Sequence, residues 1–511
     1  MTADSHGREI LLGDLNATEA LGARIAAGLK VGSVVALEGD LGAGKTTLAR
    51  AILRALGVTE TVPSPTFTLV QSYDTPRLTV RHYDLYRIER AEEMAELGLE
   101  EALDEGAVLI EWPERAGRFL PAEALHVRLE IAGEARRAVI SGNAAADRQA
   151  AIDAFLARAG WGDAERFPLP SDASTRRYVR LKRGAKTALL LDQPQSAETP
   201  AAPADATPQE RRALGYNAVA RLAGADCARF VAVADYLRAQ GLSAPEVYAS
   251  EAREGLVLIE DLGDALYADA LAEGADAATL YQAAAEVLAK LHARPAPSVL
   301  PPDKALHAYD ETALLAETDL LPQWFFPLAL GRQAEPDEFE EHRALWRAAL
   351  APYLSSPPVF VHRDYHAQNL LWLPAREGAA RVGLIDFQDA VAGARAYDLV
   401  SLIEDARRDV APALAEATVA HYFHAMRAQG TPLEAQAFAC ERAVFAAQRN
   451  AKIVGIFTRL YRRDGKARYL SYLPLVWSYL GRDLGHPALS SLKSWYDRHI
   501  PQEARGIPRG A

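Results

Sequence analysis

An eight-residue segment constrains the fold of the N-terminal third more than any other part of the sequence. Residues 39–46 read Gly-Asp-Leu-Gly-Ala-Gly-Lys-Thr and fit the pattern G-x-x-x-x-G-K-[ST] in full. An apolar, β-branched run at 33–38 precedes the segment, and residues 46–56 follow it with helical periodicity. Glycines let backbone N–H groups surround phosphate oxygens, and the start of a helix adds positive potential there. The segment therefore predicts a phosphate-binding loop between a strand and a helix of an α/β domain.

The lysine of this segment stands out against the composition of the chain. Of the 56 basic residues, nine are lysine and 47 are arginine, and Lys45 is one of two lysines in the first 181 residues. A compact ammonium reaches the β- and γ-phosphates of a nucleotide in a way that the bulkier guanidinium does not. We therefore expect Lys45 to hold phosphate and the Thr46 hydroxyl to bind Mg²⁺.

Two carboxylates follow predicted strands in the same region. Asp84 ends an alternating segment at 78–83, and Glu111 ends a buried segment at 107–110. The first place suits an acid that holds Mg²⁺ through water, and the second suits a group that orients an attacking water. The alternative for each is an ordinary polar residue at the end of a strand.

Three further segments follow the loop along the chain: Ser-Pro-Thr-Phe-Thr-Leu-Val at 64–70, His-Tyr-Asp-Leu-Tyr-Arg at 82–87 and Glu-Trp-Pro-Glu at 111–114. Together with the loop they resemble the TsaE (YjeE) family, the ATPase subunit of the bacterial machinery that makes tRNA threonylcarbamoyladenosine. The resemblance covers residues 8–142. It implies a small P-loop NTPase fold, hydrolysis of ATP with Mg²⁺, and work in a complex with the TsaD and TsaB subunits. It also implies that tRNA is reached only indirectly, through that complex.

The same resemblance assigns roles to single residues. Thr46 and Asp84 would serve the metal. Thr47 and Glu111 would form the catalytic pair, and Thr66 would lie on a nucleotide-sensing loop. The ATP-binding residues implied by the motif match are Gly39, Asp40, Gly42, Ala43, Gly44, Lys45, Thr46, Thr66 and Trp112.

A second group of polar residues lies in the C-terminal half. Residues 362–369 read His-Arg-Asp-Tyr-His-Ala-Gln-Asn after an apolar strand, and Leu-Ile-Asp-Phe follows at 384–387. Phosphoryl transfer to an alcohol needs a carboxylate that accepts the hydroxyl proton, and Asp364 has that position. Asn369 and Asp386 would supply oxygen ligands for Mg²⁺. The pattern predicts the catalytic loop of a kinase.

Segments outside this loop add to the pattern. They are Ser-Asp-Ala-Ser-Thr-Arg-Arg-Tyr at 171–178, Leu-Ile-Glu-Asp-Leu-Gly at 258–263 and Gln-Arg-Asn-Ala-Lys-Ile-Val-Gly-Ile-Phe at 448–457. With the loop they resemble the aminoglycoside phosphotransferase/choline kinase superfamily, and within it the AmgK-type kinases of N-acetylmuramate and N-acetylglucosamine. The resemblance covers residues 165–500. It implies an α+β fold of two lobes like that of protein kinases.

The same resemblance marks the expected ATP-binding residues of the C-terminal half. Ser174 would lie in a nucleotide-covering loop, and Glu260 and Leu262 would lie in the hinge that receives adenine. Kinases of this fold also carry a lysine on the third strand for the α- and β-phosphates, but the predicted strand at 187–191 has none. Lys186, which precedes that strand, is assigned this role, with Arg177 and Arg180 of the earlier loop and strand as the alternative.

The leading interpretation is a fusion of two enzymes that both use MgATP. It consists of a TsaE-like P-loop ATPase domain at 1–148, a linker at 149–164 and an aminoglycoside phosphotransferase-like kinase domain at 165–505. Members of the kinase group are known as such fusions. The kinase acceptor would be an amino sugar of cell-wall recycling, with an aminoglycoside or an amino alcohol as alternatives. The missing strand lysine motivates another interpretation, in which the C-terminal half is a non-catalytic nucleotide-binding regulatory module.

Composition argues against several classes of protein. The formal charge of −12 argues against a dedicated nucleic-acid-binding surface. Two cysteines, Cys227 and Cys440, cannot form a disulfide framework and are too few for a zinc site. The clearest apolar runs fall short of the roughly 18–20 residues that span a bilayer, and the polar N-terminus carries no signal segment. We therefore expect a cytoplasmic protein.

Overall fold

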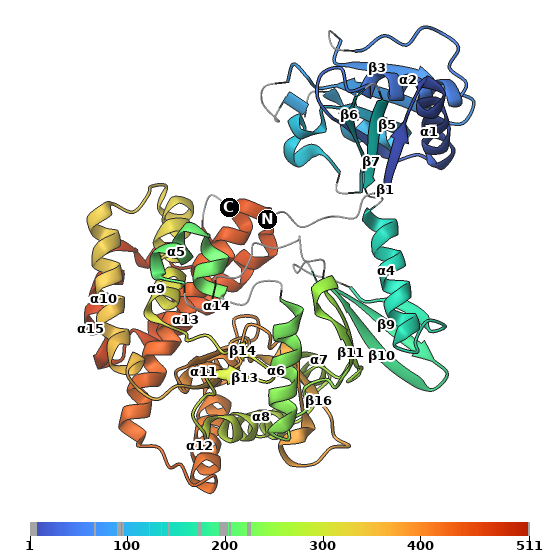
Figure 1. Cartoon of the computed structure of the whole chain (residues 1–511). Helices are drawn as coiled ribbons and strands as arrows, with labels where there is room; N and C mark the ends of the chain where they lie inside the picture. Colours follow the sequence, from blue (N-terminus) through green and yellow to red (C-terminus); the bar gives the residue numbers. More distant parts are fainter. Residues whose placement is uncertain are drawn as a thin grey trace. The chain divides into compact units, whose positions relative to one another are not determined.

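The chain divides into two compact units, Met1–Ala157 and Arg158–Ala511 (Figure 1). The division falls inside the segment 149–164, and helix α4 (Ala144–Arg158) makes the first part of that segment helical. The computed structural model describes residues 8–65, 68–88, 93–94, 97–121, 123–133, 135–141, 144–170, 176–193, 203, 206–221 and 226–508.

The first unit is built on a seven-stranded sheet with the strand order β1-β7-β6-β2-β5-β4-β3. Strands β6, β2, β5 and β4 run parallel at its centre. β7 pairs antiparallel with β6 and with β1, and β3 pairs antiparallel with β4. The strands are β1 (Arg8–Leu12), β2 (Val34–Glu38), β3 (Val70–Asp74), β4 (Thr79–Asp84), β5 (Gly106–Glu111), β6 (Leu125–Ala132) and β7 (Ala135–Ser141).

Helices cover both faces of this sheet. Val35 and Leu37 of β2 belong to the apolar core under α1 and α2, whereas Val34 and Ala36 belong to the core under α3. Both faces of β2 are therefore buried, as expected for a central parallel strand. This arrangement confirms the predicted α/β class of the N-terminal domain. The helices are α1 (Leu15–Gly28), α2 (Lys45–Ala55) and α3 (Leu99–Glu105).

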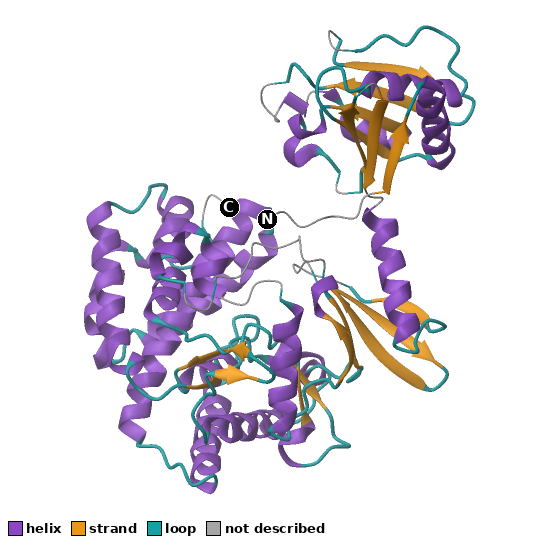
Figure 2. Cartoon of the chain, in the orientation of Figure 1, coloured by secondary structure: helices purple, strands orange, loops and turns teal. Residues whose placement is uncertain are grey.

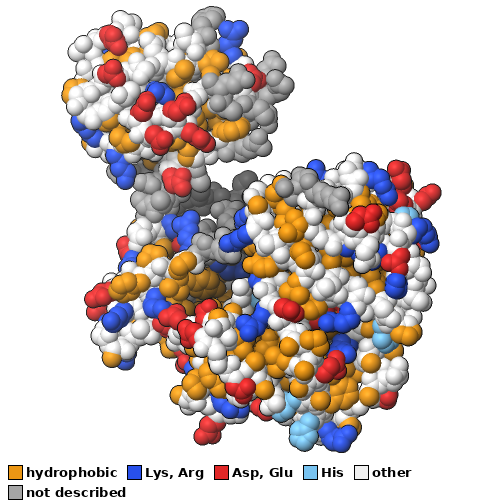
Figure 3. Space-filling view, turned by 180° about the vertical axis from the view of Figure 1, so that it is seen from behind, with side chains coloured by type: hydrophobic (Ala, Val, Ile, Leu, Met, Phe, Trp, Pro, Cys, Tyr) orange, Lys and Arg blue, Asp and Glu red, His pale blue; other side chains and the backbone are white. Residues whose placement is uncertain are grey.

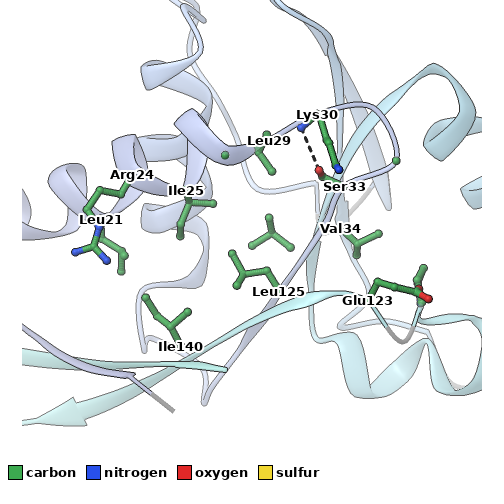
Figure 4. Close-up of a pocket in the computed structure, with 14 residues that line it drawn as sticks. Leu21, Arg24, Ile25, Leu29, Lys30, Ser33, Val34, Glu123, Leu125 and Ile140 are labelled. Atoms are coloured by element: carbon green, nitrogen blue, oxygen red, sulfur yellow. Dashed lines mark hydrogen bonds between the residues drawn. The ribbon is translucent and has the colours of Figure 1, made fainter. Parts of the chain in front are cut away.

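A cavity of about 520 Å³ opens at the edge of the sheet where β2 and β6 begin (Figure 4). Apolar side chains of α1 and of these strands line it, and beside it the backbone N–H of Lys30 donates to Ser33 Oγ (3.0 Å). The phosphate-binding loop follows the opposite end of β2, so this cavity is separate from the predicted nucleotide site. Its lining residues are Leu21, Arg24, Ile25, Gly28, Leu29, Lys30, Gly32, Ser33, Val34, Val35, Pro121, Glu123, Leu125 and Ile140.

The second unit begins with a five-stranded sheet in the order β11-β12-β10-β9-β8. All neighbouring strands in it run antiparallel. The hairpin of β9 and β10 pairs Lys186 with Arg183 at one end and Asp192 with Arg177 at the other. The strands are β8 (Glu165–Pro168), β9 (Arg177–Arg183), β10 (Lys186–Asp192), β11 (Val247–Glu251) and β12 (Leu256–Glu260).

The rest of the second unit is mainly helical (Figure 2). Its short strands pair as β13 (Val299–Leu300) with β14 (Lys304–Ala305), β15 (Val359–Val361) with β18 (Val391–Gly393), and β16 (Leu370–Trp372) with β17 (Val382–Leu384). A five-stranded sheet followed by a helical lobe confirms the predicted protein-kinase-like fold of two lobes. The α-helices described in this lobe are α5 (Pro208–Ala213), α6 (Cys227–Ala239), α7 (Tyr267–Ala272), α8 (Ala277–His292), α9 (Glu311–Thr318), α10 (Pro336–Leu354), α11 (Ala396–Ile403), α12 (Pro412–Ala428), α13 (Ala435–Asp464), α14 (Leu473–Asp483) and α15 (Ser490–His499).

No helix in the described parts of the chain combines the length and the apolar character of a membrane span. On the face of the second unit seen in Figure 3, Lys and Arg side chains are interspersed with Asp and Glu side chains. A mixture of both signs is typical of a solvated protein surface.

Candidate active sites

The first candidate site lies at the edge of the seven-stranded sheet where β2, β4 and β5 end. Asp84 ends β4 and Glu111 ends β5, and the two are direct neighbours in the parallel register. The loop 39–44 follows β2, and α2 begins at Lys45. These elements form a pocket of about 310 Å³ that brings together most of the predicted residues. The pocket is lined by Leu41, Gly42, Gly44, Lys45, Thr46, Thr47, Ser64, Asp84, Tyr86, Glu111 and Trp112.

The backbone of the loop requires its glycines. Gly39, Gly42 and Gly44 have φ angles of 131°, 81° and 108°, which residues with a Cβ atom rarely adopt. At Gly39 a Cβ atom would also lie 2.3 Å from the carbonyl oxygen of Leu129. Glycine is therefore the one residue that fits the first position of the loop without moving its neighbours.

The Lys45 ammonium is held inside the loop. Its Nζ donates hydrogen bonds to the carbonyl oxygens of Gly39 (2.6 Å) and Asp40 (3.0 Å), and it lies 3.8 Å from the centroid of the Trp112 ring. Burial lowers the pKa of Lys45, and nearby carboxylates, first among them Glu111, oppose this shift. The loop thus holds a partly desolvated cation at the place where phosphate oxygens would bind.

Glu111 is positioned by two partners. Its Oε2 accepts a hydrogen bond from Thr46 Oγ1 (2.9 Å), and its Oε1 lies 2.9 Å from His82 Nε2. His82 is fully buried and Glu111 is 2% exposed. A carboxylate held at both oxygens has a fixed orientation toward the pocket, where Thr47 lies on the next position of α2.

Asp84 is also held at both oxygens. Its Oδ2 accepts a hydrogen bond from Ser64 Oγ (2.8 Å), and its Oδ1 accepts one from the backbone N–H of Tyr86 (3.1 Å). The carboxylate of Asp84 and the hydroxyl of Thr46 line the same pocket. Both groups are hard oxygen donors, so the pair fits Mg²⁺.

The other predicted residues of this unit lie around the pocket or outside the described part of the chain. Gly39, Asp40 and Trp112 line a neighbouring hollow of about 710 Å³. Ala43 is buried within the loop. Thr66 lies outside the residues that the structure describes.

The second candidate site is built on the segment between β15 and β16. His362 and Arg363 follow β15, and their backbone N–H groups donate to the two carboxylate oxygens of Asp398 (2.6 and 2.8 Å). Arg363 has a φ angle of 81°, and this double contact stabilises its left-handed conformation. The next residue is Asp364, whose side chain is half-buried. The catalytic loop is therefore fixed at its first turn.

Asp364, Asn369 and Asp386 come together in this site. Asn369 Nδ2 lies 3.0 Å from the carbonyl oxygen of Asp364 and 3.5 Å from Asp386 Oδ2. Gln388 Nε2 donates to Asp386 Oδ1 (2.8 Å). Burial and the neighbouring Asp364 raise the pKa of Asp386, as expected where carboxylates face one another. A divalent cation relieves such repulsion, and carboxylate and amide oxygens are donors that fit Mg²⁺.

A buried ion-pair network is attached to the catalytic loop through Arg363. Glu317 of α9 is fully buried, and its Oε1 accepts from Arg363 Nη2 (2.6 Å) and Lys452 Nζ (2.8 Å). Its Oε2 accepts from Gln448 Nε2 (3.1 Å) and from the Tyr309 hydroxyl. Burial alone would raise the pKa of Glu317, but Lys452 and Arg363 lower it to about 2. Glu317 is therefore a carboxylate that joins α9 and α13 to the loop.

Sequence reasoning assigned no role to three residues that the structure places in these sites. His82 had a usable signal, because it lies two residues before Asp84 on β4 and so points to the same side of the sheet. Lys452 had a weaker one, as a lysine in a chain that has few. Glu317 had none, since its basic partners lie 46 residues and more away along the chain.

Comparisons with known proteins match both parts of the chain. The family model described as threonylcarbamoyl adenosine biosynthesis protein TsaE matches residues 12–139. The model of the phosphotransferase enzyme family matches residues 167–433, which is more than half of the chain. The chain belongs to both families. It joins a TsaE-family domain to a phosphotransferase-family domain, which confirms the predicted fusion.

Individual relatives repeat this division. The N-acetylmuramate/N-acetylglucosamine kinase of Caulobacter vibrioides is 45% identical over 362 residues, 70% of this chain and 98% of the relative. The kinase with the same name from Pseudomonas aeruginosa is 32% identical over 326 residues, 63% of this chain and 85% of the relative. The tRNA threonylcarbamoyladenosine biosynthesis protein TsaE of Rickettsia felis is 42% identical over 129 residues, 25% of this chain and 75% of the relative. The first two relatives are named as kinases and the third as a TsaE protein, in agreement with the two family models.

In the phosphotransferase domain the predicted ATP-binding residues are spread over several places. Glu260 ends β12, and its carboxylate forms an ion pair with Arg376. Adenine bound in the hinge would therefore contact the backbone of Glu260 and not its side chain. Leu262 is half-buried two residues later. Lys186 is exposed at the start of β10. Ser174 lies outside the described part of the chain.

Proposed function

We propose that the phosphotransferase domain is an ATP-dependent kinase of amino sugars. It transfers the γ-phosphoryl group to the anomeric hydroxyl of N-acetylmuramate or N-acetylglucosamine, as a step of cell-wall recycling. The observation that carries this proposal is the meeting of Asp364, Asn369 and Asp386 at one place. An N-acetylmuramate/N-acetylglucosamine kinase is 45% identical to this chain over 362 residues, which are 98% of that relative.

The residues of the site have separate tasks in this reaction. Asp364 accepts the proton of the acceptor hydroxyl as the phosphoryl group moves. Asn369 and Asp386 would hold Mg²⁺, which would neutralise charge on the phosphates. Asp398 and Glu317 keep the loop in shape through the backbone and the side chain of Arg363.

Product formation with a panel of acceptors tests the kinase proposal. The purified chain is incubated with MgATP and N-acetylmuramate, N-acetylglucosamine, choline, ethanolamine or an aminoglycoside. We expect an amino-sugar phosphate from the wild type, and a loss of about 10²–10⁴-fold in Asp364→Asn. Asp337→Asn changes an exposed aspartate of α10 and is the matched control. Lys45→Ala disables the other domain, so product made by this variant comes from the phosphotransferase domain.

Other outcomes of the same experiment point to the alternatives. Phosphorylation of choline or ethanolamine alone would assign an amino alcohol as the acceptor, and phosphorylation of the aminoglycoside alone would assign that class. Binding of nucleotide without any product would favour a regulatory module. Product that does not depend on Asp364 would contradict the proposed mechanism.

We propose that the TsaE-family domain hydrolyses ATP in the formation of N6-threonylcarbamoyladenosine at position 37 of tRNA. It acts with the TsaD and TsaB subunits and reaches tRNA through that complex. The pocket at the ends of β2, β4 and β5 supports this proposal, as does the 42% identity to a TsaE protein. Both domains would work in the cytoplasm, where ATP and tRNA are found.

The geometry suits ATP hydrolysis. Lys45 would contact the β- and γ-phosphates, and the Thr46 hydroxyl and Asp84 would hold Mg²⁺, which would neutralise phosphate charge. Glu111, held at both oxygens, orients the attacking water together with Thr47. The Glu111 carboxylate is already oriented before the water binds, so little free energy is spent on reorganising it during the reaction.

Modified tRNA measured in cells tests this second proposal. Wild-type chain, Lys45→Ala and Lys30→Ala are expressed in a bacterial strain that has no other TsaE. The nucleosides of its tRNA are then measured by mass spectrometry. We expect threonylcarbamoyladenosine with the wild type and with Lys30→Ala, an exposed lysine after α1, and its loss with Lys45→Ala. Full modification with Lys45→Ala would refute the proposal.

A further inference from the structure

The phosphotransferase domain has no lysine within β10 after its first residue. Kinases use a lysine on this strand to contact the α- and β-phosphates of ATP. Lys186, the first residue of β10, is exposed and pairs across the hairpin with Arg183. Because β10 has seven residues, Lys186 lies roughly 20 Å from the other end of the strand. The other end of the strand, at Asp192, lies near the candidate metal ligand Asp386. Arg176 contacts both Asp386 and Gln193, the residue after Asp192.

The other cations of the β9–β10 hairpin are exposed or engaged. Lys182 lies on the same outer end of the hairpin as Lys186 and is exposed. Arg180 forms ion pairs with Asp261 (2.9 Å) and Asp264 (2.6 Å). These two acids belong to the segment that follows β12, so Arg180 ties β9 to the hinge.

Arg176, directly before β9, has a different environment. Its side chain is 6% exposed, and its Nη1 lies 3.6 Å from Asp386 Oδ1. Its Nε donates a hydrogen bond to Oε1 of Gln193 (3.2 Å), which directly follows β10 and is 2% exposed. A buried amide at the end of β10 thus holds the guanidinium beside the carboxylate that is the candidate metal ligand.

We propose that Arg176 takes the place of the strand lysine and contacts the α- and β-phosphates of ATP in the phosphotransferase domain. The proposal rests on the proposed use of ATP by this domain. Asp386 would hold the metal that neutralises phosphate charge, so a cation 3.6 Å from that carboxylate lies where the phosphates would bind. The guanidinium is always charged and offers two parallel N–H groups to a phosphate. Arg176, directly before β9, therefore supplies the positive charge that β10 lacks at the end near the catalytic loop.

Nucleotide binding to the full chain tests this assignment without any acceptor. The Lys45→Ala background removes binding at the TsaE-family loop, so titration should show a single remaining site. In this background Arg176→Gln, Arg176→Lys and Lys186→Gln are titrated with MgADP and with adenosine by calorimetry. Adenosine carries the base and the sugar but no phosphate, so it reports the adenine pocket alone.

We expect Arg176→Gln to weaken MgADP binding by about tenfold or more, since a charged hydrogen bond is lost. Adenosine binding should stay within about twofold, and Arg176→Lys should keep part of the MgADP affinity. Lys186→Gln, the matched control, should bind both ligands like the parent.

Three results would overturn the assignment. They are unchanged MgADP affinity in Arg176→Gln, an equal loss of adenosine and MgADP, or a tenfold loss of MgADP in Lys186→Gln. Because no acceptor is present, a failure to find phosphorylated sugar bears on the proposed function and not on Arg176.

Discussion

Lys45 Nζ lies 3.8 Å from the centroid of the Trp112 ring, while the same ammonium donates to two carbonyl oxygens of its own loop. Trp is the aromatic side chain that attracts cations most strongly. Trp112 directly follows Glu111 and has a φ angle of 59°, so its ring is set by a left-handed backbone at the end of β5. Phosphates that enter the loop compete with both kinds of contact for the ammonium.

We expect MgATP to change the fluorescence of Trp112, because phosphate oxygens draw Lys45 away from the ring. The other six tryptophans of the chain lie beyond residue 157. The signal is therefore obtained as the difference between titrations of the wild type and of Trp112→Phe. Lys45→Ala should lack the change. A flat difference titration would contradict the predicted movement.

Glu111→Gln should slow ATP hydrolysis by about 10²–10⁴-fold with a much smaller change in KM. The substitution keeps the size of the side chain next to Thr46 and His82 but removes the charge that orients water. Phosphate release in the presence of TsaD and TsaB measures the effect. Glu114→Gln, an exposed carboxylate three residues further on, is the matched control. Similar losses in both variants would count against a specific role of Glu111.

Glu317→Gln should destabilise the phosphotransferase domain by roughly 3–5 kcal/mol, because Arg363 and Lys452 are left without their buried counter-charge. Urea unfolding followed by tryptophan fluorescence measures this change. Glu311 lies on the same helix as Glu317 and forms an exposed ion pair with Arg347 of α10 (2.9 Å). Glu311→Gln breaks this pair and should cost at most about 1 kcal/mol. Equal costs for the two variants would show that the buried network adds no special stability.

His342 should make the phosphotransferase domain less stable in acid. Its ring is fully buried, and Trp346 Nε1 donates to its Nε2 (2.9 Å). Burial, with a further effect of Arg343, lowers the pKa of His342 to about 3. An unfolded chain takes up this proton near pH 6.5. The unfolded state therefore binds more protons between about pH 6.5 and 3, and stability falls as the pH falls through this range.

His342→Gln removes this dependence on pH. The stability advantage of the wild type over the variant should shrink by on the order of 2 kcal/mol between about pH 7 and 4.5. Urea unfolding at several pH values measures it. His424→Gln, at an exposed position of α12, should leave the difference from the wild type constant. An advantage of the wild type that grows in acid would reverse the predicted sign.

Local patterns were enough to predict the parts of each site that lie within one loop or at adjacent strand ends. Asp84 and Glu111 could be paired from the sequence, because parallel strands end at the same edge of a sheet. Asp364 and Asn369 lie five residues apart on one loop. The role of Glu317 could not be predicted, because it depends on how α9 packs against α13 and the catalytic loop.

Lys186 and Arg176 show a second limit of sequence reasoning. Lys186 is the first residue of the strand that should carry a cation, yet the hairpin places it at the exposed end. Arg176 lies ten positions earlier, but the pairing of β9 with β10 brings it to the buried end, next to Gln193. Distance along the chain is a poor guide to distance across a hairpin, because the two strands run in opposite directions.

Asp386 has a φ angle of 60°, and among residues with a Cβ atom aspartate and asparagine adopt this left-handed conformation most readily. Glycine would suit the backbone and lose the carboxylate beside Asn369. Glutamate would keep a carboxylate, but on a backbone that it adopts less readily and at the end of a longer side chain. The exchange of aspartate for glutamate costs little on many protein surfaces, but at this position the backbone and the carboxylate together disfavour it. Evolutionary drift at residue 386 is therefore confined to aspartate for as long as this position must supply a carboxylate on a left-handed backbone.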